Sequence, residues 1–259
     1  MALTERSQTV IDAVKLHRPA ARRRAGLFLA EGPNLVEAAL RSRAVEHIFA
    51  TEAALERFAD LLADAPVRLV TERAAKALSD TVTPVGLVAQ CRSIAATWAQ
   101  IVADSPRFVV VAVDISEPGN AGTLIRVADA MGADAVVLAG NSVDPFNGKS
   151  LRASAGSIFN IPVVSEGDVA AIVGDLSALG AAVLATTLDG DRSLDEADSI
   201  LAGPCAWIFG NEAHGLDDAT AALATHRISI PMRGGAESLN LASAASICLY
   251  ATARMHRRQ

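Results

Sequence analysis

The chain has 259 residues, of which 51% are hydrophobic and 20% are charged, and its net charge is −6. This composition excludes a disordered chain, the apolar stretches are too short to cross a bilayer, and the acidity argues against an unspecific polyanion binder. Cys91, Cys205 and Cys248 lie far apart in apolar surroundings. This pattern indicates reduced core thiols, so we expect a soluble cytoplasmic protein.

The first ninety residues predict a compact α/β unit. Apolar runs at residues 27–30, 45–50, 67–70 and 86–91 are strand candidates, and helical spacing separates them at 34–40, 52–62 and 72–78. The looser segment from Arg92 to Pro106 indicates a linking helix and a domain boundary. We therefore expect one domain at residues 1–97 and a second at 98–259.

A cluster of basic residues precedes the first predicted strand. Lys15, Arg18, Arg22, Arg23 and Arg24 lie within ten residues. Such a patch can bind nucleic-acid phosphates even on an acidic protein. The same residues also fit a solvated helix face, and charge alone does not decide between the two interpretations.

The second part of the chain predicts a mostly parallel sheet. Strands are expected at residues 108–113, 135–138, 161–164, 181–185 and 204–209, and helices at 124–131, 168–179 and 238–255. Continuous apolar runs are typical of strands covered on both faces. Their alternation with helices favours an α/β fold with helices on both sides of the sheet.

Three polar segments begin where apolar runs stop. They are PGNAGTLIR at 118–126, FGNEAHG at 209–215 and IPMRGGAESLN at 230–240. Loops that follow buried strands lie at the rim of the sheet, where α/β folds bind their ligands. We therefore expect the three segments to converge on one site.

Each of these segments also has an ordinary structural interpretation. Arg126 fits the solvated edge of an amphipathic helix, and Glu212, Ser238 and Asn240 all fit helix caps. Established nucleotide motifs do not match, because residues 119–122 lack dinucleotide spacing and residues 146–150 lack the first glycine of a P-loop. His214 has no second ligand at metal-binding spacing, so no metal is expected.

Taken in order, the three segments resemble the SpoU (TrmH-type) family of RNA ribose 2′-O-methyltransferases, within the SPOUT superfamily. The matching motifs are N-x-G-T-x-x-R at 120–126, G-N-E-x-x-G at 210–215, and I-P-M followed by E-S-L-N within 230–240; KSLRASAG at 149–156 fits the middle region of the family. Residues 28–40 resemble the start of the family's N-terminal substrate-binding domain. The resemblance implies an L30e/L7Ae-like α/β domain at 1–97 with an N-terminal helical extension. A SPOUT α/β domain with a parallel sheet and a C-terminal trefoil knot would follow at 98–259.

The resemblance also implies a reaction, a cofactor and site residues. S-adenosyl-L-methionine would bind near Thr186, Gly210, Ile230, Met232 and Leu239, and the catalytic residues would be Arg126, Asn120, Glu212, Ser238 and Asn240. Because a guanidinium stays protonated, we interpret Arg126 as an electrostatic stabiliser of the ribose oxygen. Family members are homodimers in which the partner's first loop completes each site.

The expected substrate is structured RNA, with 23S (large-subunit) rRNA preferred because L30e-like modules read folded RNA elements. Transfer RNA is the alternative substrate. An RNA-binding protein of the same fold that has lost catalysis is a second alternative, and the intact set of candidate catalytic residues argues against it. A nucleotide-dependent α/β enzyme using residues 119–122 ranks last.

Overall fold

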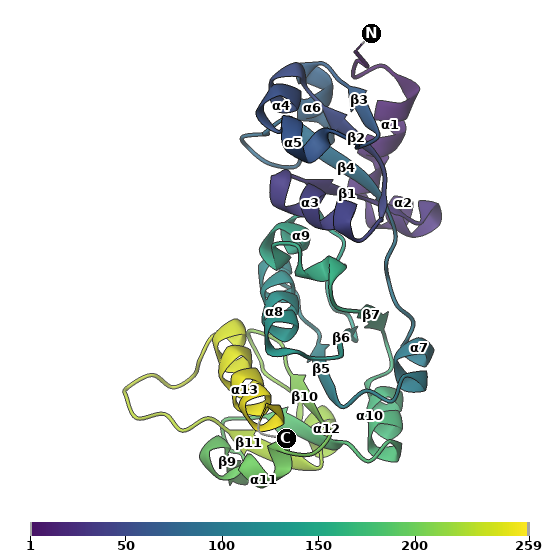
Figure 1. The fold of residues 1–259 in the computed structure, drawn as a ribbon. Helices are drawn as coiled ribbons and strands as arrows, with labels where there is room; N and C mark the ends of the chain where they lie inside the picture. The colour runs from purple at the N-terminus through teal and green to yellow at the C-terminus, as the bar shows by residue number, and fades with distance from the viewer. Residues whose placement is uncertain (1, 258–259) are drawn as a thin grey trace. The chain divides into compact units, whose positions relative to one another are not determined.

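The computed structural model describes residues 2–257, which divide into two compact units (Figure 1). The first unit contains the residues up to 94 together with 146–160, and the second contains 95–145 together with the residues from 161 onward. The chain therefore passes between the units three times. Within the described residues, no helix combines the length and apolar character needed to cross a membrane.

The first unit is built on a four-stranded sheet. Its strands, in spatial order, are β1 (Leu27–Glu31), β4 (Leu87–Arg92), β2 (Val45–Ala50) and β3 (Val67–Leu69). β4 is antiparallel to both neighbours, and β2 and β3 are parallel. The four predicted strands are confirmed to within two residues at each end.

Short helices surround this sheet. They are α1 (Gln8–Val14), α2 (Pro19–Ala25), α3 (Pro33–Arg41), α4 (Glu52–Arg57), α5 (Ala59–Leu62) and α6 (Glu72–Leu78). α1 and α6 bury apolar side chains against Leu29, Phe49 and Val88 of the sheet. The single helix predicted at 52–62 is wrong, because Phe58 adopts φ −117° and ψ 30° and separates α4 from α5. Local spacing did not indicate the helices before β1; an N-terminal helical extension was expected from the family resemblance alone.

The second unit contains a seven-stranded sheet in which every pairing is parallel. The order is β7 (Val163–Glu166), β6 (Ala135–Ala139), β5 (Phe108–Val113), β10 (Cys205–Phe209), β8 (Ala182–Thr186), β11 (His226–Ser229) and β9 (Arg192–Ser193). β5, β6 and β10 are buried along their whole length, which confirms the interpretation of their continuous apolar runs. β9 and β11 escaped prediction because their sequences are mostly polar.

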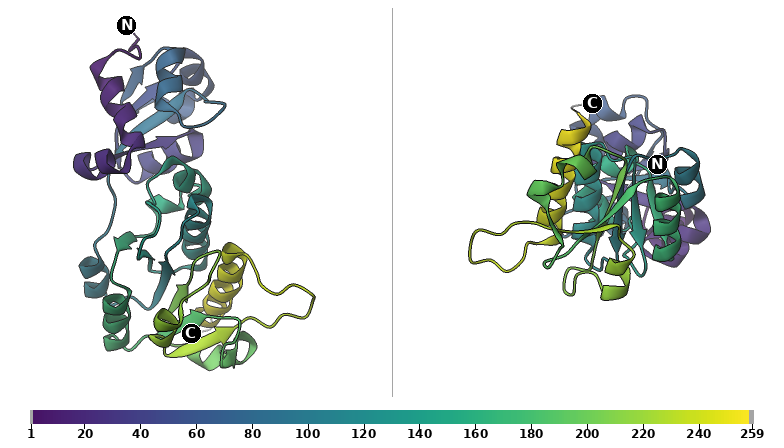
Figure 2. Two further views of the ribbon diagram at one scale, coloured as in Figure 1. Left: turned by 180° about the vertical axis from the view of Figure 1, so that it is seen from behind. Right: turned by 90° about the horizontal axis from the view of Figure 1, so that it is seen from below.

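Helices cover both faces of this sheet (Figure 2). α8 (Pro118–Met131) and α13 (Leu241–His256) pack together on one face. On the other face, α7 (Trp98–Ala103) and α10 (Val169–Ala178) share a core with alternate residues of β5. Trp98 Nε1 of α7 donates a hydrogen bond to Asp175 Oδ2 of α10 at 2.8 Å, within one helical layer. Trp207 Nε1 of β10 donates to Thr252 Oγ1 of α13 at 2.9 Å and so joins the sheet to the other layer.

Two helix starts differ from the prediction, and both matter for the site. α8 begins at Pro118 and not at residue 124, because proline is favoured in the first turn and the Glu117 side chain caps Gly119 N. α13 begins at Leu241 and not at residue 238, so Ser238 lies in the preceding loop. Residues 231–238 of that loop are exposed, and the loop projects from the unit (Figure 1).

Candidate active site

The candidate site lies where two neighbouring strands of the large sheet send their chains in different directions. From β5 the chain continues through α8 to β6 on one side, whereas β10 borders β8 on the other side. Because the strands are parallel, residues 114–117 after β5 and residues 210–215 after β10 open at the same edge. Such a switch point is the usual ligand position in open α/β sheets.

A single carboxylate joins these two loops. Glu212 Oε1 accepts hydrogen bonds from Asn120 Nδ2 and Glu117 N, both at 3.1 Å. Its Oε2 accepts from Ser116 N at 3.3 Å and Ser116 Oγ at 3.2 Å. The carboxylate therefore binds the first turn of α8 and the segment before it, and α8 presents N–H groups that favour a negative charge there.

Burial alone raises the pKa of the Glu212 carboxyl. Hydrogen bonds from its own backbone, from Asn120 and from the backbone of Glu117 and Ser116 outweigh that effect, and the net result is a pKa below the ordinary value. Glu212 is therefore ionised at neutral pH. A carboxylate with this many donors is suited to holding the loops in position and poorly suited to accepting a proton.

The loop after β10 closes on itself through its backbone. Asn211 N donates to Gly215 O at 3.0 Å and Gly215 N donates to Asn211 O at 2.8 Å. A Cβ atom at Gly210 would lie well within 3.0 Å of the backbone of Gly215 and Leu216. Only glycine therefore allows this tight closure. Asn211 also donates to Asp114 O at 2.7 Å, which fixes the loop to the end of β5.

Asp114 itself has an uncommon backbone conformation. Its φ of 56° places it in the left-handed region, which is unusual for a residue other than glycine. The side chain offsets this strain by accepting a hydrogen bond from Asn141 N at 2.7 Å. Strained residues often lie at functional sites, and neither Asp114 nor Asn211 was singled out from the sequence.

A cavity of about 440 Å³ lies beside this loop, within the usual range for small-molecule sites. All five residues expected to bind the cofactor line it, namely Thr186, Gly210, Ile230, Met232 and Leu239. Two candidate catalytic residues, Glu212 and Ser238, also line it. Its walls combine apolar side chains such as Ile228 and Leu241 with backbone groups of the 210–215 loop.

An ion pair borders the same cavity. Arg227 Nη2 lies 2.5 Å from Asp189 Oδ2, and Arg227 N donates to Asp191 Oδ1 at 3.1 Å. The side-chain hydrogen bond from Arg227 lowers the pKa of the exposed Asp189 carboxyl. These contacts hold the turn after β8 against β11. These contacts were not predicted, although D-G-D at 189–191, a few residues after the strand predicted at 181–185, is a turn signal.

The remaining candidate catalytic residues lie differently. Arg126 is exposed on α8 and does not line the cavity. It follows Asn120 by six residues, which is about 240° around a helix, so the two side chains leave α8 in different directions. Asn240 caps α13 by accepting from Ala242 N at 2.9 Å. The first two segments thus meet in the hydrogen bond between Asn120 and Glu212, and the second and third both reach the cavity, through Glu212 and Ser238. Arg126 and Asn240 do not line it.

The predicted RNA-binding cluster lies in the first unit, and its members are not equivalent. Arg18, Arg23 and Arg24 are exposed, and Lys15 is exposed with its ammonium 2.8 Å from Asp12 Oδ1. Arg22 is buried and its Nη1 donates to Leu16 O at 2.8 Å and His17 O at 3.0 Å. Arg22 therefore stabilises the turn between α1 and α2.

Among residues 2–257, no group of three or more His, Cys, Asp and Glu side chains is placed to hold a metal ion. His214 lies in the loop after β10 and lines the cavity, but no cluster of metal ligands surrounds it.

Known proteins share both units of this structure. Residues 107–250 match the SpoU rRNA Methylase family, and residues 7–89 match the MRM3-like substrate binding domain. The chain is 36% identical to the 23S rRNA (guanosine(2553)-2′-O)-methyltransferase RlmP of Bacillus subtilis, over 95% of this chain and 96% of that protein.

Solved structures of methyltransferases are also similar to this chain over nearly its whole length. The SpoU methyltransferase AviRb from Streptomyces viridochromogenes, in complex with AdoMet, has a TM-score of 0.85 and 28% identity, over 97% of this chain and 99% of that chain. An AdoMet-bound rRNA methyltransferase from Sinorhizobium meliloti has a TM-score of 0.81 and 29% identity, over 98% of both chains. The chain belongs to the SpoU rRNA methylase family.

Proposed function

We propose that this protein transfers a methyl group from S-adenosyl-L-methionine to a ribose 2′-hydroxyl of 23S rRNA. The observation that carries the proposal is the cavity at the switch point of the parallel sheet, bordered by the Glu212 and Asn120 contact. Similarity to RlmP over nearly the whole of both chains supports the large-subunit rRNA.

The residues around the cavity fit the cofactor. Ile230, Leu239 and Leu241 offer apolar surface for a flat base, and the backbone of the 210–215 loop offers polar partners. Glu212, Asp189 and Asp218 line the cavity together with Arg227, and this excess of acidic residues complements a positively charged sulfonium. When bound there, the cofactor supplies an electrophilic methyl group.

The protein's own task is to place and activate a weak nucleophile. A ribose hydroxyl reacts poorly at neutral pH until it is oriented and its developing negative charge is stabilised. We assign charge stabilisation to Arg126, and we assign a positioning role to Glu212, which fixes Asn120 and the 210–215 loop. Ser238 and Asn240 would orient the substrate from the loop before α13.

We further propose that the protein is a homodimer. The side chain of Arg126 is exposed and lies away from the cavity lining of its own chain, so a second copy can present its own Arg126 to this cavity. α13 keeps Ile247 and Tyr250 exposed at 41% and 55%, and burying these side chains would favour association. A C-terminal trefoil knot is expected from the family and belongs to the same proposal.

Arg18, Arg23 and Arg24 are proposed to bind RNA phosphates, and the match of residues 7–89 to a substrate binding domain supports this role. The three cysteines support a cytoplasmic location, because they are free and buried. Burial raises the pKa of the Cys91 and Cys205 thiols to about 12. Such thiols are structural and suit a reducing compartment.

One experiment tests the proposal. Purified protein is incubated with total RNA and a labelled methyl donor, and new 2′-O-methyl sites are mapped by sequencing. The expected result is a discrete new site in 23S rRNA. Methylation of tRNA alone would reassign the substrate, and cofactor binding by calorimetry without any methylation would favour an RNA-binding protein that has lost catalysis.

A further inference from the structure

In the sequence, residues 146–160 lie between strands of the second unit, but in the structure they belong to the first unit. This segment lies between β6 and β7, two neighbouring parallel strands of the second unit, and within the residues that match the methylase family. A connection between such strands normally packs its helix back onto their own sheet. Here the connection packs within the first unit.

Apolar contacts hold this segment in the first unit. The Phe146 and Phe159 rings lie 4.9 Å and 5.9 Å from the ring of Phe28 on β1, measured between centroids. Leu151 and Ile158 are fully buried. At the end of α9 (Gly148–Ser154), Ala155 and Gly156 have φ values of 50° and 98°, and a Cβ on Gly156 would lie 3.0 Å from that of Ala38.

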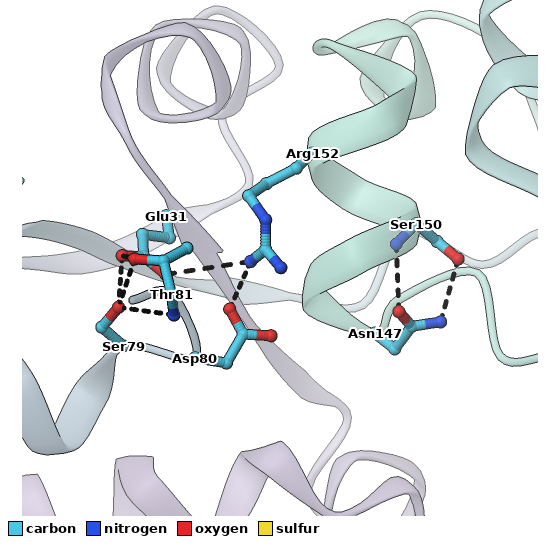
Figure 3. Close-up of polar contacts among 7 residues, drawn as sticks. All are labelled: Glu31, Ser79, Asp80, Thr81, Asn147, Ser150 and Arg152. Carbon is cyan, nitrogen blue, oxygen red and sulfur yellow. Dashed lines mark hydrogen bonds and ion pairs between the residues drawn. The ribbon is translucent and has the colours of Figure 1, made fainter. Parts of the chain in front are cut away.

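A polar network fixes the same segment (Figure 3). Glu31, at the end of β1, accepts hydrogen bonds from the hydroxyls of Ser79 and Thr81 and lies 3.9 Å from Arg152 Nη1. Arg152 also forms an ion pair with Asp80. Only 10% of the Glu31 side chain is exposed. A buried carboxylate needs such partners, so removing the guanidinium leaves a charge with less compensation.

Asn147 caps the start of α9, and two serines of this helix are buried. Asn147 Oδ1 accepts from Ser150 N at 3.0 Å, and Asn147 Nδ2 donates to Ser150 Oγ at 2.9 Å. Ser150 and Ser154 are completely buried, and Ser154 Oγ donates to Leu151 O at 2.7 Å. The KSLRASAG motif therefore forms a preorganised structure that presents Arg152 to Glu31 and Asp80.

We propose that residues 146–160 are a docking segment that fastens the methyltransferase unit to the RNA-binding unit, and that Arg152 is the positioning residue that locks it. The chain then crosses between the RNA-binding unit and the unit that holds the cavity at 145–146 and at 160–161, in addition to the linker at 94–95. Loosening the segment leaves RNA and cofactor bound but misplaces the ribose, and misplacement by about 1 Å can reduce turnover 10²-fold.

The docking itself is tested without any activity. A protease recognition sequence is inserted between Ile94 and Ala95 of the full chain and cut after purification. The two fragments should stay together on size-exclusion chromatography because the segment remains docked. Arg152→Ala should weaken this association, so that the fragments dissociate at a protein concentration at least tenfold higher than for the unsubstituted chain. Arg73→Ala, which removes an exposed arginine of the same unit, should leave that dissociation concentration unchanged. Separation of the fragments without any substitution would overturn the docking segment.

The positioning role rests on the proposed function and is tested in the uncut chain. Arg152→Ala should lower turnover at saturating RNA at least tenfold, with affinities for S-adenosylmethionine and RNA within twofold and an unchanged circular dichroism spectrum. Arg152→Lys keeps the charge and should recover part of the turnover. Unchanged turnover in Arg152→Ala would overturn the role, as would a parallel loss of RNA affinity. If the unsubstituted chain methylates no RNA, the proposed function fails while the cleavage result still stands.

Discussion

The carboxylate of Glu212 and the side-chain amide of Asn120 form a 3.1 Å hydrogen bond across 92 residues of sequence. This bond joins the loop after β10 to the first turn of α8, at the edge of the sheet where the segments after β5 and β10 continue in different directions. Glu212 also accepts from the backbone of Ser116 and Glu117. The contact therefore determines the shape of the cavity rim.

Replacing this carboxylate by an amide should weaken the rim without removing the side chain. We expect Glu212→Gln to lower affinity for S-adenosylmethionine and turnover each by about tenfold, because hydrogen bonds to a charged acceptor contribute about 1.5–3 kcal/mol. Calorimetry and single-turnover kinetics measure the two effects. Glu196→Gln, an exposed glutamate of the same unit, is the matched control, and equal behaviour of both variants would contradict the assigned role.

The same pair predicts a pH dependence. Because the folded-state pKa of Glu212 lies below its ordinary value, its stabilising effect is complete at neutral pH and is lost as pH falls through the folded-state pKa. The difference in Tm between the unsubstituted chain and Glu212→Gln should therefore be constant from pH 8 to about 5 and shrink below about 4. A difference that grows on acidification would have the wrong sign.

Gly210 offers a test of the backbone closure beside this rim. Gly210→Ala places a Cβ against Gly215 and Leu216, so the loop must open, and cofactor binding should fall at least tenfold. Gly174→Ala is the control, because Gly174 lies exposed inside α10 with nothing within 4 Å of a new Cβ. That change should stabilise the protein by about 1 kcal/mol. Cofactor binding is measured by calorimetry and stability by denaturant unfolding.

The sequence predicted the strands of this site better than its contacts. Apolar runs located β5 and β10, and the turn residues after them indicated a ligand site at the sheet rim. The pairing of Asn120 with Glu212 could not be predicted, because it depends on which strands are neighbours and not on local spacing. The direction of Arg126 also depends on where α8 begins, and the proline and the Glu117 cap moved that start by six residues.

Local patterns also could not show where residues 146–160 belong. Their apolar residues fit a core, but the sequence does not say which core. Tertiary contacts, such as those of the Phe146 ring with Phe28 and of Arg152 with Asp80, assign them to the first unit. The burial of Arg22 within the basic cluster was likewise not predictable from the sequence. The other basic residues of the cluster are exposed, while the guanidinium of Arg22 is buried against two backbone carbonyl groups.

The basic cluster should therefore separate into two classes of variant. Arg22→Ala leaves the carbonyls of Leu16 and His17 without their donor, so it should lower the free energy of unfolding by about 1–3 kcal/mol. Arg23→Ala combined with Arg24→Ala should leave stability unchanged and weaken RNA binding, with a shallower dependence on salt. Chemical denaturation and filter binding at several salt concentrations distinguish them. RNA affinity that is unaffected by the double variant would remove these arginines from the RNA surface.

The exposed face of α13 should determine the oligomeric state. Ile247→Asp and Tyr250→Asp place charges where we expect a second copy to bind, so each should convert dimers to monomers at micromolar concentration. Val82→Asp is the control, because Val82 is 99% exposed in the first unit. Sedimentation velocity measures the change. A protein that is monomeric before any substitution would contradict the dimer directly.

The position of Arg126 gives the most discriminating prediction. Arg126→Ala should lower turnover by about 10²-fold while leaving cofactor affinity unchanged, on the scale of a lost charge-stabilising donor. If the arginine acts in the partner's cavity, dimers that combine one Arg126→Ala chain with one Gly210→Ala chain contain one complete site. At a cofactor concentration too low to saturate Gly210→Ala, random mixing of the two impaired proteins should then restore about a quarter of the original activity. If Arg126 acts within its own chain, each mixed dimer has two defective sites and mixing restores nothing, because neither chain then combines a working arginine with a closed 210–215 loop.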